Sequence, residues 1–75
     1  MRSYNLFRRK GREDLCCAVP ESYAVPPFVG GERWTFGGKV EDRSPPPPGF
    51  DDRAAATAVR FNGFYLFQST ERRLD

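Results

Sequence analysis

Hydrophobic and polar residues alternate near the start of the chain, as in a strand with one buried face. Residues 3–9 show this period of two, and the mostly apolar residues 14–19 then read as the return strand. The polar segment 10–13 between them contains Gly11, which adopts a positive φ at little cost. We therefore predict a β-hairpin whose second strand stops at Pro20. In that second strand the alternation separates one face from the other, with Leu15, Cys17 and Val19 on the first and Cys16 and Ala18 on the second.

The pattern is lost and then returns in the middle of the chain. Residues 21–31 contain prolines and a glycine pair, which predict an irregular loop laid over the sheet. Alternation resumes at 32–40, where Trp34 and Phe36 share a face, and this segment predicts a third strand. The glycine pair at 37–38 marks a β-bulge or a sharp bend in it.

A proline-rich spacer separates the third strand from a helix. The four prolines at 44–49 favour an extended conformation and indicate a stiff internal spacer rather than a ligand for an SH3 or WW domain. The alanine-rich segment 53–61 predicts a helix, with Asp51 or Asp52 as its N-terminal cap. Asn62-Gly63 predicts its end, because glycine readily adopts the left-handed conformation found there.

Residues 64–68 predict a fourth strand. This segment is apolar on both faces, so we expect it inside the sheet. The alternative is a helix that continues through Gly63, since an interior glycine costs only about 1 kcal/mol relative to alanine.

The order of these elements predicts an α+β fold. A run of strands before one helix favours a small antiparallel sheet of three or four strands with the helix packed on one face, in β-β-β-α-β order. We expect one compact domain over residues 1–70, including the spacer at 44–49, and a flexible C-terminal tail at 71–75.

Composition limits the size of the core. The 75 residues include 15% aromatic side chains, and isoleucine is absent. A chain this short buries a small share of its surface, so we expect most of its rings in the core. Self-association would let this small chain bury more surface, so a homodimer is a candidate state.

Charge is concentrated at the first hairpin. The net charge is +2, yet residues 1–12 hold five of the twelve basic side chains and no acid, which leaves seven basic and ten acidic residues elsewhere. Aromatic rings beside cations can stack on bases and neutralise phosphates, so the hairpin is a candidate nucleic-acid interface. Its candidate residues are Tyr4, Phe7, Arg8, Arg9, Lys10 and Arg12.

Most reactive chemistry is excluded by missing residue types. Histidine is absent, so histidine-dependent nucleophilic systems cannot form, and two adjacent cysteines cannot supply a structural zinc centre. The sequence contains no phosphate-binding glycine motif. We therefore expect no catalytic residues, metal or cofactor. The lack of an intrachain disulfide scaffold, of a signal peptide and of a long apolar run favours a cytoplasmic protein without a membrane partner.

Binding is the remaining class of function. Our first hypothesis is a small non-enzymatic protein-interaction or regulatory module whose partner, another protein or a second copy, contacts exposed rings such as Trp34, Phe36 and Tyr65. The alternative hypothesis is a nucleic-acid-binding protein that uses the basic aromatic hairpin.

Overall fold

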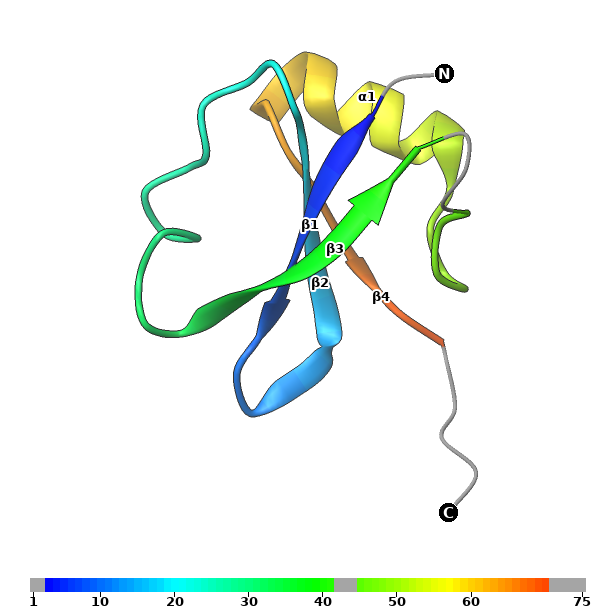
Figure 1. Cartoon of the computed structure of the whole chain (residues 1–75). Coiled ribbons are helices and arrows are strands. Elements are labelled where there is room, and N and C mark those ends of the chain that lie inside the picture. The colour runs from blue at the N-terminus through cyan, green and yellow to red at the C-terminus, as the bar shows by residue number, and fades with distance from the viewer. Residues whose placement is uncertain (1–2, 42–44, 71–75) are drawn as a thin grey trace.

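The computed structural model describes residues 3–41 and 45–70, and it has the predicted α+β architecture. Four strands form one antiparallel sheet in the order β3-β1-β2-β4. In Figure 1 the helix runs across the upper end of the sheet, and the segment joining β2 to β3 forms a wide loop at the left. The bounds are β1 Tyr4–Arg9, β2 Arg12–Pro20, β3 Trp34–Val40, α1 Asp52–Asn62 and β4 Tyr65–Gln68.

The first hairpin is confirmed, and its second strand pairs along most of its length with β1. Leu6 lies opposite Ala18, and Phe7 opposite Cys17. The turn is shorter than expected, because β2 already begins at Arg12, and Gly11 takes a φ of 83°. The expected faces of β2 are also confirmed, since Cys16 and Ala18 pack in one core cluster and Cys17 and Val19 in another.

The predicted bulge in β3 is real. Leu6 of β1 lies opposite Gly38, whereas the next residue, Phe7, lies opposite Phe36. Gly37 is therefore the extra residue, and Gly38 has a φ of 118° that favours glycine.

The helix begins and ends where the sequence predicts. The carboxylate of Asp51 accepts hydrogen bonds from the backbone N–H groups of Arg53 and Ala54, at 2.9 and 3.0 Å. Gly63 takes the left-handed conformation, and its N–H donates to the carbonyl of Val59. The chain then enters β4, so the alternative of a helix continuing through Gly63 is wrong.

The expectation that the fourth strand lies inside the sheet is also wrong, because among the described residues β4 is an edge strand that pairs only with β2. Its two apolar faces have another cause. Tyr65 and Phe67 pack under the helix, while Leu66 points to the opposite face and is 46% exposed.

The two faces of the sheet carry separate cores. The helix face is covered by α1 and by Phe50, and it buries Tyr4, Leu6, Cys16, Ala18, Val40, Tyr65 and Phe67. The loop face is covered by residues 21–33, and it buries Cys17, Val19, Val29 and Trp34. Four rings remain exposed, namely those of Tyr23, Phe28, Phe36 and Phe61.

Two further expectations concern the membrane and the tail. Within residues 3–41 and 45–70, the structure contains no helix with the length and apolar character needed to cross a bilayer. The tail predicted at 71–75 lies outside the described residues.

Candidate functional site

The structure divides the predicted partner-binding residues between the two faces of the sheet. Trp34 and Tyr65 are each only 9% exposed, the first on the loop face and the second on the helix face. Phe36 shares the loop face and is 60% exposed. The expectation that these rings are exposed is therefore wrong for Trp34 and Tyr65, and of the three only Phe36 is exposed.

The residues of the candidate nucleic-acid hairpin are divided in the same way. Tyr4 is buried on the helix face, where its ring meets Phe50 edge to face. Arg8 shares that face: one guanidinium nitrogen donates to the carbonyl oxygen of Glu13 at 3.0 Å and lies 3.6 Å from the sulfur of Cys16. A Cβ at Gly37 would lie 2.9 Å from the side chain of Arg8, so this arginine passes closely over the bulge.

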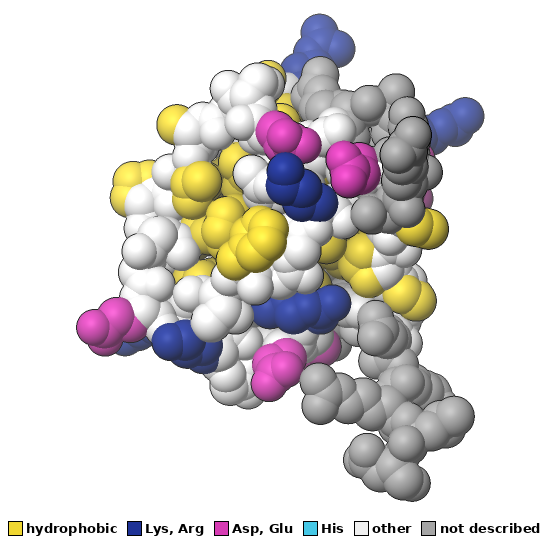
Figure 2. All heavy atoms as spheres, viewed as in Figure 1, with side chains coloured by type: hydrophobic (Ala, Val, Ile, Leu, Met, Phe, Trp, Pro, Cys, Tyr) yellow, Lys and Arg dark blue, Asp and Glu magenta, His cyan; other side chains and the backbone are white. Residues whose placement is uncertain are grey.

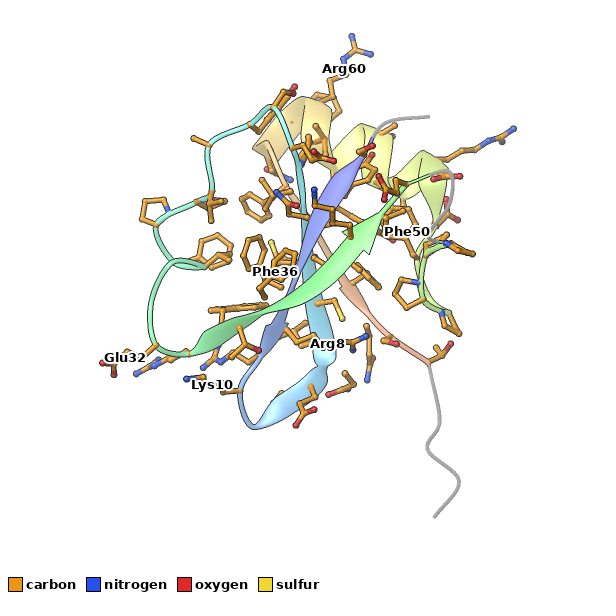
Figure 3. All side chains as sticks on the ribbon, viewed as in Figure 1. Arg8, Lys10, Glu32, Phe36, Phe50 and Arg60 are labelled. Carbon is orange, nitrogen blue, oxygen red and sulfur yellow. The ribbon has the colours of Figure 1, made fainter. Side chains whose placement is uncertain are left out.

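Lys10 and Arg12 lie exposed at the end of the hairpin. The guanidinium of Arg12 is 3.7 Å from the carboxylate of Asp14. The amide of Gln68 donates to the same carboxylate at 2.7 Å, and this bond, with help from Arg12, holds the pKa of Asp14 below its ordinary value. Arg12 thus has an ionised acid beside it at neutral pH. Figure 3 shows Arg8 and Lys10 on opposite sides of the hairpin.

The two remaining residues of the hairpin set, Phe7 and Arg9, meet other aromatic side chains on the loop face. The rings of Phe7 and Phe36 lie directly opposite each other on β1 and β3, edge to face, with centroids 5.9 Å apart. The guanidinium of Arg9 lies 5.9 Å from the centre of the Trp34 ring. Figure 3 shows Phe36 in front of the place where β3 passes β1.

Lys39 completes this group because of the bulge. Asn5, Phe7 and Arg9 alternate along β1 and share one face, and their partners on β3 are Lys39, Phe36 and Trp34. The extra residue at Gly37 thus returns Lys39 to the face of Phe36. The ammonium of Lys39 lies 3.6 Å from the carboxylate of Glu21, and both side chains are exposed by more than 40%.

We call Phe7, Phe36, Arg9 and Lys39 the Phe7–Phe36 platform. Along the strands a cation flanks the two rings on either side, at Arg9 and at Lys39. Figure 2 shows apolar side chains gathered at the centre and left of the same view, with Lys and Arg side chains below them. Sequence reasoning missed Lys39, although the glycine pair that brings it to this face was recognised.

Both cysteines are buried, on opposite faces of β2. Burial raises the pKa of Cys17 to about 12, with the neighbouring Cys16 as a smaller cause. A thiol with so high a pKa is a poor nucleophile at neutral pH. In the part of the chain that the structure describes, no group of three or more cysteine, aspartate or glutamate side chains is placed to hold a metal ion.

Comparison of the chain with protein-family models, with curated proteins and with solved structures found no match.

Proposed function

We propose that the protein is a non-enzymatic binding protein for single-stranded nucleic acid and that the Phe7–Phe36 platform is its contact surface. The observation that carries the proposal is the pair of adjacent rings on the loop face, with Phe36 60% exposed and with Arg9 and Lys39 beside the pair along the strands. In this arrangement an unpaired base stacks on Phe36, and the two cations contact neighbouring phosphates.

The rings supply the sequence-tolerant part of binding. Every base has a flat π surface, and stacking on an exposed aromatic side chain contributes about 1–3 kcal/mol per base. Phe36 rests edge to face on Phe7, so little side-chain freedom is lost on binding. Bases in a duplex are stacked on each other, so this platform favours single strands.

The cations supply the salt-dependent part. Arg9 lies beside the Trp34 ring, and Lys39 has only a surface ion pair with Glu21, which contributes about 0–1 kcal/mol. A phosphate can replace such a partner at small cost. The exposed Lys10, next along the chain, adds positive charge at the hairpin end. Tyr4 and Arg8, which the sequence grouped with these residues, lie on the helix face.

Fluorescence anisotropy tests the proposal directly. Labelled mixed-sequence RNA and DNA single strands of about 15 nucleotides are titrated with the protein at low and at physiological salt. We expect binding that weakens with salt, and Phe36→Ala should weaken it by about 5- to 150-fold. Phe61→Ala is the matched control, because Phe61 is 76% exposed on α1 and should leave binding unchanged.

A pair of double variants tests the cations. Arg9→Ala with Lys39→Ala should weaken binding and make the negative slope of log K against log salt shallower by about 1.4. Arg53→Ala with Arg60→Ala removes the same charge from the helix and should have a much smaller effect. Equal losses in the two double variants would show only a general effect of net charge, and absence of binding at low salt would reject the proposal.

The protein-interaction hypothesis remains the second candidate. It is favoured by exposed apolar side chains in the 21–33 loop and on β3, since Val25, Phe28 and Phe36 are 43%, 46% and 60% exposed. A protein partner on this surface should bind without strong salt dependence. Such binding should be lost in Phe28→Ala, which we expect to leave nucleic-acid binding nearly unchanged.

A further inference from the structure

The two edge strands of the sheet differ in what lies beside them. At β4 the proline-rich segment occupies the outer side of the strand end: the N–H of Thr70 donates to the carbonyl of Pro48 at 2.9 Å. The backbone of Gly49 lies so close to the carbonyl of Gln68 that a Cβ there would overlap it. This segment blocks the end of that edge against another strand.

The outer edge of β3 has no such cover among the described residues. No strand of this part of the chain pairs with it, and its seven residues include no proline. The regular part of this edge before the bulge, residues 34–36, is therefore an uncovered template for another strand.

The hydrogen-bonding direction of β3 can be assigned before the bulge. The carbonyl of Arg33 accepts from the N–H of Lys10 at 2.7 Å and therefore points toward β1. Along an antiparallel strand the backbone N–H and C=O groups of successive residues point alternately to one side and the other. The backbone groups of Trp34 and Phe36 therefore point to the free edge, and those of Thr35 point toward β1. Only pairings that match Trp34 and Phe36 with outward-pointing partners can extend the sheet.

From this we infer that the occupant of the edge is a second copy of the chain, paired antiparallel through β3 around a two-fold axis at Thr35. Thr35 then lies opposite the partner's Thr35, and Trp34 lies opposite the partner's Phe36. Both outward-pointing residues of one chain meet those of the other. A two-fold axis closes the assembly at two copies, as in most homodimers.

The side chains are complementary in this register. Trp34 and the partner's Phe36 form an aromatic cross-strand pair, and the two threonines form another favourable pair. Arg33 lies opposite the partner's Gly37, which has no side chain to oppose it. Glu32, immediately before Arg33, comes to the part of the partner strand that contains the partner's Lys39, so this carboxylate approaches a cation of the partner.

A dimer would also increase the share of its surface that this small chain buries. This inference does not rest on the proposed nucleic-acid function, since a monomer can carry the Phe7–Phe36 platform. In the dimer two such platforms would lie on one continuous face.

Sedimentation equilibrium of the full chain over a range of concentrations tests the inference. We expect wild-type protein with twice the 8.6 kDa mass of the chain. Thr35→Lys places two ammonium groups opposite each other and should give the monomer mass, while Thr57→Lys, on the exposed side of α1, should leave the dimer intact. Far-ultraviolet circular dichroism confirms that each variant is folded. A wild-type monomer at every concentration would overturn the inference.

Disulfide trapping tests the register. Thr35→Cys should form a dimer when oxidised glutathione accepts the two electrons and is reduced to two glutathione molecules, because residues opposed in a non-hydrogen-bonded antiparallel pair have Cα atoms about 4.5 Å apart, within the range that a disulfide spans. Thr57 is also exposed, so Thr57→Cys is the control and should stay unlinked, and the native cysteines are buried. A wild-type dimer in which Thr35→Cys links no faster than Thr57→Cys would place the interface elsewhere and reject the β3 pairing.

Discussion

The helix α1 and the 21–33 loop cover opposite faces of one sheet with different completeness. On the helix face, the ring of Phe50 lies at the centre of an aromatic cluster, with centroids 5.4–5.5 Å from those of Tyr4, Tyr65 and Phe67. None of these three residues is more than 9% exposed. Residues from β1, β4 and the segment before α1 thus close one continuous core.

The loop face has a thinner cover. Val29 is buried there, and the ring of Phe28 spans from Trp34 to Phe64, with centroids 6.0 and 5.1 Å away. Phe28 itself is 46% exposed, and the loop leaves Phe36 uncovered at one edge of the sheet and Leu66 at the other. The comparison indicates that the helix face mainly supplies stability, while the loop face combines a small core with an accessible aromatic surface.

The largest effect should come from the helix face. Phe67→Ala removes a ring that is 7% exposed and contacts both Phe50 and Tyr65. We expect it to lower the free energy of unfolding by about 3–5 kcal/mol, measured by urea denaturation with Trp34 fluorescence. Phe61→Ala, at a ring that is 76% exposed, should change it by less than about 0.5 kcal/mol. Similar losses in the two variants would contradict the assignment of the main core to this face.

Alkaline pH should lower the free energy of unfolding through Cys17, which is buried on the loop face. Its pKa rises from 9.0 to about 12 on folding, so above pH 9 the unfolded chain releases this proton while the folded chain keeps it. Stability should fall as pH rises from 9 to 12, by at most about 1.4 kcal/mol per pH unit from this group. Cys17→Ala should make the fall in stability less steep, measured by urea denaturation at each pH. An unchanged slope in Cys17→Ala would show that this thiol does not contribute.

Val29→Ala compares the loop cover with the helix cover. The side chain is 2% exposed and packs in the cluster that contains Cys17, Val19 and Trp34. Removing its two methyl groups should cost about 2 kcal/mol, less than Phe67→Ala, because less apolar surface is lost. Val25→Ala, in the same loop but 43% exposed, is the control and should cost less than about 0.5 kcal/mol. If the two variants were equal, the loop would not form a packed cover.

The elements with strong local signals were predictable from the sequence. A single aspartate at position 51 caps the helix, Gly63 ends it, and the glycine pair at 37–38 provides the bulge. Each of these depends on the conformational preferences of one or two residues, which act in the same way in any fold.

The positions of α1 and of the 21–33 loop over the two faces of the sheet could not be predicted from such local signals. The segment 64–68 is apolar on both sides because a helix covers one face and a loop contacts the other, and local pattern cannot distinguish this from a central position. Trp34 is buried because Phe28 is brought over it by a loop without regular pattern. The exposure of individual rings therefore depends on contacts between distant segments, and the candidate site could be only partly identified.

Apart from the exposed control positions, the smallest effect on stability should come from Phe36→Ala. This ring loses only its edge-to-face contact with Phe7 and little buried area, so we expect a cost of about 1 kcal/mol or less in urea denaturation. The same variant should lose about 1–3 kcal/mol in binding to single-stranded nucleic acid. A side chain that matters more for binding than for folding belongs to a surface. A cost in stability close to that of Phe67→Ala would instead assign Phe36 to the core and remove the physical basis of the platform.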